Sequence, residues 1–466
     1  MKPLAILGTG SDAGKTTLVM ALCRIFADQD LKVAPFKAQN VSNNSAVTQE
    51  GREISRAQCL QAEAARIEPS YLFNPVLLKS HGNGSVQVIV NGLVHKKQTI
   101  AAYYDEIDHL KVQVHQAFSR LQKDYDLVIA EGAGSPVELN LLAKDLSNTY
   151  IANTFNTKNI LVADIERGGV FASIYGTMAL MDPVMRGNLS GVVINKFRGD
   201  RRFFDEGEKI IRDRFGVPVL GVLPFQPLNI DMEDSQSLRN YQQRQDDVKI
   251  RIAVIAYPGL SNYNDLDVLM ADPEIYVELI HSYRSLNNFD MVLLPGSKTV
   301  ISDLQWLKQQ GLFNELQHFN KPVFGLCGGY QMLCQSLHDP DMLEHDIASI
   351  ETGLGFIDDI VVYQSPKILQ SGYYQLFSYT AIKGYEIHCG RMDKYPLHCQ
   401  SGRFTGTHVH GVFDDDTFRG DYFKAINPHY QGFYYAHYRE EQIQGFTDMV
   451  AENLDTAAIL QALQTG

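Results

Sequence analysis

The stretch LAILGTGSDAGKTT, residues 4–17, decides how the first half of this chain folds. An apolar run typical of a buried strand leads into a glycine-rich loop, which ends where a helix is predicted to begin. In such a strand–loop–helix unit, successive backbone N–H groups and the helix N-terminus bind phosphate. The stretch therefore predicts a P-loop-type α/β domain with a parallel sheet. The predicted nucleotide-binding residues are Gly10, Ser11, Asp12, Ala13, Gly14, Lys15, Thr16 and Thr17.

Within this loop, Lys15 is expected to reach the outer phosphates of ATP and Thr16 to hold Mg²⁺. The loop is one residue longer than the common pattern, because five residues rather than four separate Gly8 from Gly14. That spacing resembles the loop of dethiobiotin synthetase and its relatives, ATP-dependent enzymes that activate a carboxylate. A plain strand-to-helix turn is the alternative interpretation.

Other polar residues follow predicted strands of the same domain. In PFKAQN, Lys37 and Asn40 are expected near the substrate and the γ-phosphate, and Lys37 is a candidate catalytic residue. In IAEGAGSP, Glu131 ends a strand, where a second Mg²⁺ ligand belongs. In INKFRGD, Asn195 is a candidate for reading the adenine edge, although an asparagine in a turn is nearly as good an explanation.

Apolar β-rich runs alternate with helical patterns along the whole chain, which indicates parallel sheets covered by helices. The first domain is predicted over 1–233. The polar stretch DSQSLRNYQQRQDDVK, 234–249, is predicted to be a linker, and a second α/β domain is expected over 250–466. Its later strands are expected to form a sheet with antiparallel members.

Composition narrows the class of protein. The net charge of -13 and the lack of a basic cluster argue against a nucleic-acid partner. Neither a membrane span nor a signal peptide is expected, and the scattered cysteines resemble no disulfide framework. A soluble cytoplasmic protein is predicted, and the sequence leaves its oligomeric state open.

The stretch FGLCGGYQ, 324–331, places Cys327 on a glycine-flanked turn between a predicted strand and a helix. This is the spacing of a nucleophile elbow, in which the helix N-terminus favours the thiolate and the N–H of Gly328 can face an oxyanion. Downstream, GTHVHGVF offers His408 and His410 as bases, which would share one face of a strand. In LLPGSK, Gly296 and Ser297 are the candidates for the second oxyanion donor.

Several longer sequence motifs, taken in order, resemble those of proteins in which a class I glutamine amidotransferase domain is fused to a dethiobiotin-synthetase-like ATPase. The resemblance is greatest to the cobyric acid synthase family. The motifs are PFKAQNVSNNSAVT, EGAGSP, DIERGGVFASIYGT, INKFRGD, LPGSKTVISDL, CGGYQML, GYEIHCGR and HGVF.

The resemblance implies that Cys327 attacks the side-chain amide of L-glutamine with help from His410, while Gln331 holds the glutamine. The first domain would use ATP to phosphorylate a corrinoid carboxylate, which ammonia then amidates. The implied substrate is adenosylcobyrinic acid a,c-diamide, amidated at carboxylates b, d, e and g. Asp145 aligns with an acidic position near the corrinoid and is a candidate for positioning ammonia or the carboxylate; a solvated surface aspartate is the alternative.

Some features depart from the family pattern or leave alternatives open. The glutamate that most class I amidotransferases carry two residues after the histidine is missing, since Val412 follows Gly411. His408 could compete with His410 or orient it, and a zinc site at His388–Cys389 and His398–Cys399 is disfavoured by spacing. The rival functions are cobyrinic acid a,c-diamide synthase and a partitioning-type switch ATPase.

Overall fold

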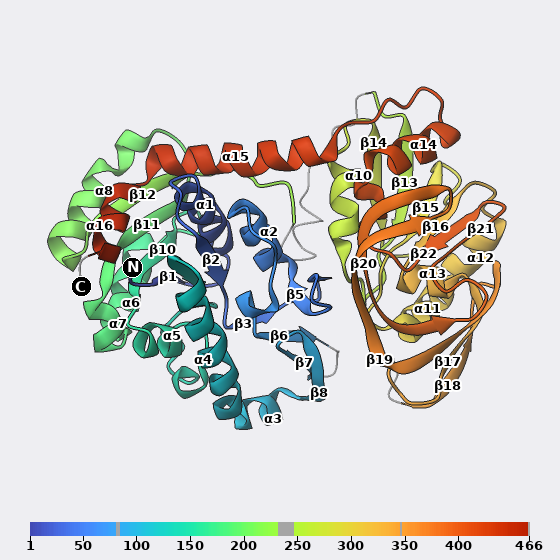
Figure 1. The fold of residues 1–466 in the computed structure, drawn as a ribbon. Helices are drawn as coiled ribbons and strands as arrows, with labels where there is room; N and C mark the ends of the chain where they lie inside the picture. Colours follow the sequence, from blue (N-terminus) through green and yellow to red (C-terminus); the bar gives the residue numbers. More distant parts are fainter. Residues whose placement is uncertain (81–83, 232–246, 345–346, 465–466) are drawn as a thin grey trace. The chain divides into compact units, whose positions relative to one another are not determined.

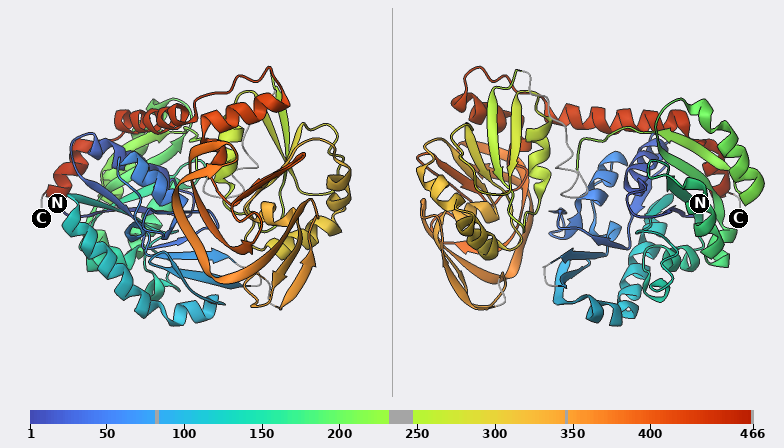
Figure 2. Two further views of the ribbon diagram at one scale, coloured as in Figure 1. Left: turned by 45° about the vertical axis from the view of Figure 1, so that its right-hand side comes forward. Right: turned by 180° about the vertical axis from the view of Figure 1, so that it is seen from behind.

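The computed structural model describes residues 1–80, 84–231, 247–344 and 347–464 (Figures 1 and 2). These residues form two compact units. The first unit contains Met1–Ser42, Ile54–Leu228 and Glu440–Gly466; the second contains Asn43–Glu53 and Asn229–Arg439.

The division differs from the predicted boundaries in two places. Segment Asn43–Glu53 groups with the second unit although it lies early in the chain, and Glu440–Gly466 groups with the first although it is C-terminal. The C-terminal segment is fixed there by backbone bonds, for example from Asp455 N to the carbonyl oxygen of Leu220 at 2.8 Å. Most of the predicted linker, 234–249, lies outside the described residues.

The first unit is built on a parallel sheet whose strand order is β12-β11-β10-β1-β9-β2. Every residue of β1 is buried, as expected for a central strand covered on both faces. The strands are β1 (Leu4–Gly8), β2 (Val33–Phe36), β9 (Leu127–Glu131), β10 (Lys158–Asp164), β11 (Leu189–Phe197) and β12 (Val219–Pro224). The helices are α1 (Lys15–Ala27), α2 (Arg56–Ala64), α3 (Ile100–Asp105), α4 (Ile107–Asp124), α5 (Thr149–Thr154), α6 (Val170–Leu180), α7 (Pro183–Gly187), α8 (Asp205–Ile210) and α16 (Thr456–Gln464).

A smaller sheet of the first unit has the order β3-β6-β7-β8. Its strands are β3 (Gln39–Val41), β6 (Val76–Ser80), β7 (Ser85–Val90) and β8 (Leu93–Thr99). Helix α15 (Tyr435–Asn453) begins in the second unit and ends in the first.

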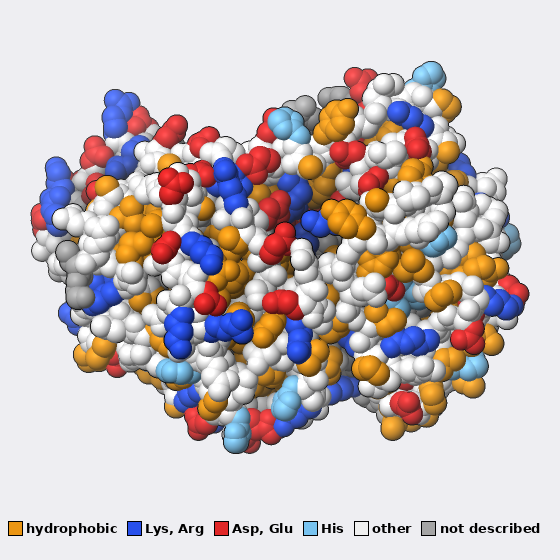
Figure 3. Space-filling model, in the orientation of Figure 1, with side chains coloured by type: hydrophobic (Ala, Val, Ile, Leu, Met, Phe, Trp, Pro, Cys, Tyr) orange, Lys and Arg blue, Asp and Glu red, His pale blue; other side chains and the backbone are white. Residues whose placement is uncertain are grey.

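On the face shown in Figure 3, acidic and basic side chains are interspersed rather than segregated.

The second unit has a sheet of order β14-β13-β15-β16-β22-β21, parallel except for the β21–β22 pair. A second sheet, β18-β17-β19-β20, carries the antiparallel pairs that the sequence predicts. The strands are β4 (Ser45–Val47), β13 (Ile250–Ile255), β14 (Ile275–Ile280), β15 (Met291–Leu294), β16 (Val323–Leu326), β17 (Cys334–Asp339), β18 (Ser349–Thr352), β19 (Ile357–Leu376), β20 (Tyr379–Met392), β21 (His398–Ser401) and β22 (Phe404–Thr407). Its helices are α10 (Asp267–Ala271), α11 (Val300–Gln309), α12 (Leu312–His318), α13 (Gly328–Met332) and α14 (Asp416–Ile426).

One predicted strand ends earlier than the sequence suggests. Strand β22 stops at Thr407, so His408 and His410 do not share a strand face. The helix after Cys327 is short, because α13 ends at Met332 and Cys334 begins β17. Cys334 is fully buried in the core. None of the helices in the described ranges is both long and apolar enough to cross a bilayer.

Candidate active sites

The first candidate site is the phosphate loop between β1 and α1. Gly14 has φ 92°, and a Cβ there would lie 2.0 Å from Nδ2 of Asn195, so only glycine fits. The ammonium group of Lys15 donates to the carbonyl oxygens of Gly10 at 2.9 Å and Gly134 at 3.0 Å. A phosphate is a stronger acceptor for an ammonium group than neutral carbonyls are. The loop geometry therefore suits an anionic ligand.

Glu131 lies at the end of the neighbouring strand β9 and gathers the polar side chains of the site. Its Oε1 accepts hydrogen bonds from Thr16 Oγ1 and Lys37 Nζ, both at 2.7 Å, and its Oε2 accepts one from Gln61 Nε2 at 2.7 Å. Burial acts to raise the pKa of Glu131, but Lys37 and the hydrogen bonds outweigh it and hold the pKa below its usual value. An ionised carboxylate beside the Thr16 hydroxyl is a set of hard oxygen donors that fits Mg²⁺.

Sequence reasoning missed Gln58 and Gln61, which lie one turn apart on α2 and face Glu131. Their spacing of three residues, which places both side chains on one face of a helix, was only a weak indication in the sequence. Asn40 differs from its predicted place: its Nδ2 donates to Ser55 Oγ at 2.7 Å and to Gln58 Oε1 at 3.1 Å. The amide therefore serves a buried network behind the site rather than facing a phosphate.

Asn195 and Asp145 also have partners that the sequence did not predict. Asn195 donates to the carbonyl oxygen of Ala13 at 2.9 Å, which ties the phosphate loop to the end of β11. Asp145 accepts backbone hydrogen bonds from Ser147, Asn148 and Thr149 at 2.9 to 3.0 Å, at the start of α5. These contacts favour a loop-holding role for Asn195 and a helix-start role for Asp145.

A cavity of about 220 Å³ adjoins the phosphate loop, and Asp145 contributes to its wall. Gly134, whose carbonyl oxygen binds Lys15, lines the same cavity. The remaining lining residues are Gln39, Tyr104, Ala133, Ser135, Glu138, Leu141, Leu142, Lys144, Leu146, Ser147 and Asn148. This cavity, which has both polar and apolar walls, is a candidate space for a substrate group beside ATP.

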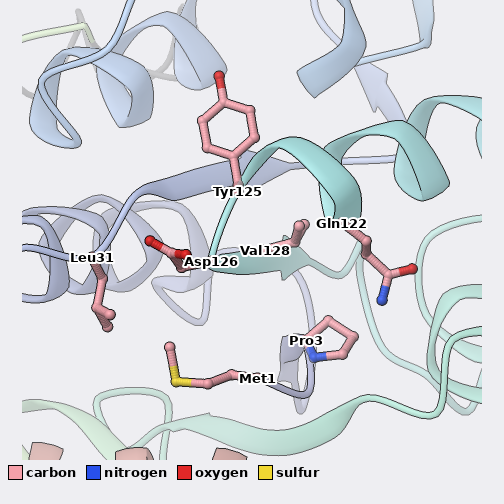
Figure 4. Close-up of a pocket in the computed structure, with 7 residues that line it drawn as sticks. All are labelled: Met1, Pro3, Leu31, Gln122, Tyr125, Asp126 and Val128. Carbon is pink, nitrogen blue, oxygen red and sulfur yellow. The ribbon is translucent and has the colours of Figure 1, made fainter.

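Another cavity, of about 330 Å³, lies away from the phosphate loop (Figure 4). It is bordered by residues that precede or begin β1 and β9, whereas the phosphate loop follows the opposite end of β1. Its lining residues are Met1, Pro3, Leu31, Gln122, Tyr125, Asp126 and Val128. Ligands of open parallel sheets bind at the carboxyl ends of the strands, so this cavity does not belong to the site.

The second candidate site is centred on Cys327, on the turn between β16 and α13. Its φ of 46° and ψ of -104° are strained for a residue with a side chain. The turn is held by a hydrogen bond from Cys327 N to the carbonyl oxygen of Thr407 at 2.8 Å. A Cβ at Gly329 would lie 2.0 Å from the carbonyl oxygen of Leu294. The glycines are therefore required for the close packing that fixes the elbow.

His410 is the candidate base beside this cysteine, and Asp265 is the third member of the group because it contacts the imidazole of His410. His410 Nδ1 lies 2.6 Å from Asp265 Oδ2, while Asp265 Oδ1 accepts the N–H of Gly411 at 2.7 Å. Burial acts to lower the pKa of His410, but Asp265 and a hydrogen bond with Cys327 outweigh it and raise the pKa to about 10. A carboxylate on Nδ1 fixes the tautomer in which Nε2 can accept the thiol proton.

Asp265 was missed because SNYNDLD matches no familiar catalytic word. It lies in the short helical turn Tyr263–Leu266, after β13. Cys327 and His410 follow β16 and β22 of the same sheet, and the carboxyl ends of parallel strands meet at one edge. Two features could have indicated Asp265. His410 lacks the glutamate that usually follows it, so another carboxylate is needed, and Asp265 follows an apolar strand of the same domain.

The loop after β15, which contains Gly296 and Ser297, borders the elbow. A Cβ at Gly328 would lie 2.8 Å from Ser297 N, and one at Gly296 would lie 3.1 Å from Cε1 of His410. The hydroxyl of Ser297 donates to Asp303, which also accepts the N–H of Gly259 at 2.9 Å. The loop is thus held next to the nucleophile, where its backbone can face an oxyanion.

His408 does not contact the nucleophile and so does not replace His410. Its ring stacks on His388 with centroids 3.9 Å apart, and its Nδ1 lies 2.7 Å from the carbonyl oxygen of Pro396. Burial holds the pKa of His408 well below its usual value. Its Nε2 lies 3.1 Å from Nε2 of Gln331, whose Oε1 accepts the hydroxyl of Tyr363 at 2.9 Å. His408 therefore orients the amide of Gln331.

No group of three or more potential metal-ligating His, Cys, Asp or Glu side chains occurs among the described residues. His388, one of the residues considered for zinc, has other partners. His388 contacts the carbonyl oxygen of Gly390 and the carboxylate of Glu386, at 2.8 and 3.1 Å.

Comparison with known proteins covers both units. Residues 4–238 match the CobQ/CobB/MinD/ParA nucleotide binding domain, and residues 251–421 match the CobB/CobQ-like glutamine amidotransferase domain. A cobyric acid synthase of Acinetobacter baylyi is 50% identical over all of this chain and all of its own length. Cobyric acid synthases of a Synechococcus strain and of Mycolicibacterium smegmatis are 37% and 38% identical, each over 99% of this chain and over 99% and 96% of their own.

The chain belongs to the cobyric acid synthase family. The predicted family and its fold, a nucleotide-binding α/β domain followed by a class I amidotransferase-like α/β domain, are confirmed. A cobyric acid synthase is a glutamine-dependent ligase, which accounts for a phosphate loop and a Cys–His–Asp group in one chain. The roles of individual residues stay predictions.

Proposed function

We propose that this member of the cobyric acid synthase family amidates carboxylates b, d, e and g of adenosylcobyrinic acid a,c-diamide, with L-glutamine as nitrogen donor. The observation that carries the proposal is the Cys327–His410–Asp265 group in a chain that also holds a phosphate loop. A carboxylate does not react with ammonia at neutral pH, so the two halves supply complementary reagents.

In the second unit, the Cys327 thiol passes its proton to Nε2 of His410, and the sulfur attacks the side-chain carbonyl carbon of glutamine. The oxyanion is stabilised by backbone N–H groups of Gly328 and of the Gly296–Ser297 loop. The imidazolium, held by Asp265 at 2.6 Å, protonates the departing nitrogen. Ammonia leaves, a glutamyl thioester stays on Cys327, and water then releases glutamate. Gln331 orients the bound glutamine.

In the first unit, an oxygen of the corrinoid carboxylate attacks the γ-phosphorus of ATP, which forms an acyl phosphate and ADP. Lys15 and Lys37 stabilise the charge on the transferred phosphoryl group. Thr16 and Glu131 would hold Mg²⁺, which when bound would supply positive charge to offset the charge of the phosphates. Ammonia then attacks the acyl carbon, and inorganic phosphate leaves.

The test is mass spectrometry of the corrinoid after incubation with ATP, Mg²⁺ and glutamine. Four successive conversions of acid to amide, starting from the a,c-diamide, support the proposal. Two conversions that start from cobyrinic acid, with none from the a,c-diamide, would select cobyrinic acid a,c-diamide synthase instead. A switch ATPase would leave the corrinoid unchanged in both incubations, and it offers no use for Cys327.

A further inference from the structure

Segment 43–53 (Asn43–Glu53) belongs to the second unit, although the residues directly before and after it in the sequence belong to the first unit. It contains β4 and the first residue of β5 (Glu53–Ser55), and β4 packs against β20 and β19. Ser45 and Glu53 are almost completely buried there. A segment so deeply buried in the amidotransferase unit is part of its structure rather than a surface loop.

Tyr385 of β20 lies between the segment and the catalytic base. The hydroxyl of Tyr385 donates to the carbonyl oxygen of Ser45 at 3.1 Å and, at 3.5 Å, to Oδ1 of Asn264, the residue before Asp265. The ring of Tyr385 is stacked on the imidazole of His410, with centroids 5.1 Å apart and an interplanar angle of 17°. The two residues also exchange backbone hydrogen bonds of 2.9 and 3.2 Å. Tyr385 therefore supports His410 by ring and backbone, and Ser45 fixes the far end of Tyr385.

Two lysines of the second unit fix the segment itself. The carboxylate of Glu53 is fully buried, pairs with Lys367 Nζ at 3.2 Å and accepts the hydroxyl of Ser45 at 2.9 Å. Burial acts to lower the pKa of Lys367, but the neighbouring Glu53 outweighs it and raises the pKa. Lys298, the residue after Ser297 in the oxyanion loop, donates to Asn43 Oδ1 at 3.5 Å. The segment thus contacts both the base support and the oxyanion loop.

The ends of the segment are fixed by the network of the first site. Asn40 precedes the segment and Ser55 follows it, and Asn40 Nδ2 donates to Ser55 Oγ at 2.7 Å. The same amide donates to Gln58, which in turn donates to Glu131 Oε2 at 3.5 Å. A series of side-chain hydrogen bonds therefore connects Glu131, the candidate Mg²⁺ ligand, with the residues that flank the segment. A shift of Glu131 on nucleotide binding would alter this network.

We propose that segment 43–53 positions His410 through Tyr385, and that it makes glutamine hydrolysis depend on the state of the nucleotide site. Tyr385 is a positioning residue, because it acts through His410. The inference rests on the proposed function, because it needs both sites to act in one reaction. Its consequence is that ammonia is released mainly when ATP and the corrinoid are bound.

The test compares glutamate release by the full chain with glutamine alone and with glutamine plus ATP, Mg²⁺ and adenosylcobyrinic acid a,c-diamide. Tyr385→Phe keeps the ring stack but loses the hydroxyl, and with it the hydrogen bond to Ser45 and the longer one to Asn264; Glu53→Gln, described below, changes the segment alone. We expect it to lower the stimulated kcat about 2- to 12-fold, the range for one net hydrogen bond, without changing the KM for glutamine. Amidation supported by ammonium chloride should be unchanged.

The matched control is Tyr374→Phe, since Tyr374 is equally buried but bonds to the carbonyl oxygen of Gln370 within β19. A second variant, Glu53→Gln, removes the charge that pairs with Lys367 and should lower stimulation in the same way. Its control is Glu351→Gln, whose partner is Lys308. Circular dichroism and the melting temperature establish that each variant is folded.

Three results would overturn the inference: wild-type glutamate release that ATP and corrinoid do not stimulate, wild-type behaviour of both Tyr385→Phe and Glu53→Gln, or an equal fall with and without ATP and corrinoid. Failure of the proposed function looks different. In that case the wild-type chain would not amidate the corrinoid even with ammonium chloride, a reaction that needs neither Cys327 nor segment 43–53.

Discussion

Replacing Asp265 by asparagine tests the assignment of the catalytic group most directly. Asp265 faces two donors: Oδ2 accepts from His410 Nδ1 at 2.6 Å and Oδ1 from the N–H of Gly411 at 2.7 Å. An asparagine has only one acceptor oxygen. If the NH₂ group of the asparagine faces Gly411, the buried N–H of Gly411 loses its acceptor. If the NH₂ group instead faces Nδ1 of His410, Nδ1 must accept, and the proton of the imidazole moves to Nε2. In that tautomer Nε2 cannot accept the proton of Cys327.

The magnitude follows from this geometry. A hydrogen bond to a charged group contributes about 1.5–3 kcal/mol, which corresponds to about 10- to 150-fold in rate. The tautomer effect adds to it, and the equivalent change in a serine protease triad lowers kcat about 10⁴-fold. We therefore expect Asp265→Asn to lower the glutamine-dependent kcat by at least about 10-fold. The pKa of His410, raised to about 10 in the wild type, should fall.

The assay is release of glutamate from glutamine, paired with amidation supported by ammonium chloride, which should be unaffected. Asp267→Asn is the matched control, because Asp267 is also buried but accepts the backbone N–H of Asp231 at 2.8 Å. If Asp265→Asn keeps half or more of the wild-type kcat, or if both activities fall together, the assigned role of Asp265 is wrong.

Three further predictions concern the nucleotide site, the elbow and the response to pH. Glu131→Gln should lower ADP formation by at least about 10-fold through loss of charge, with basal glutamate release retained; equal loss of both would contradict it. Gly329→Ala, whose Cβ would lie 2.0 Å from the carbonyl oxygen of Leu294, should lower the melting temperature and abolish glutamate release, whereas Gly372→Ala, with open space around it, should do neither. Because the pKa of His410 is raised to about 10, its stabilising effect is complete below its ordinary value of 6.5 and is lost as pH rises toward 10. The difference in melting temperature between the wild type and His410→Gln should therefore shrink from pH 7 to pH 10, and a constant difference would refute this.

The chemistry of each half could be predicted from sequence because it depends on local geometry. A phosphate loop needs a strand, a glycine-rich turn and a helix that are adjacent in the chain, so the sequence could place Lys15 and Thr16 at the start of the helix. The elbow at Cys327 is local in the same way, since Gly325 and Gly329 flank it. The same holds for Glu131, which ends its strand as predicted.

The partners of these residues were decided only by tertiary structure. Asp265 meets His410 because β13 and β22 lie in one parallel sheet and their carboxyl ends share an edge, although 145 residues separate the two in sequence. His408 and His410 looked equivalent until the end of β22 sent them to different neighbours. Segment 43–53 read as part of the first domain, because nothing in its own composition indicates where it is buried. A residue's type and its near neighbours determine what chemistry it can perform, but its pairing with a distant side chain depends on how strands are ordered in a sheet, which short motifs do not encode.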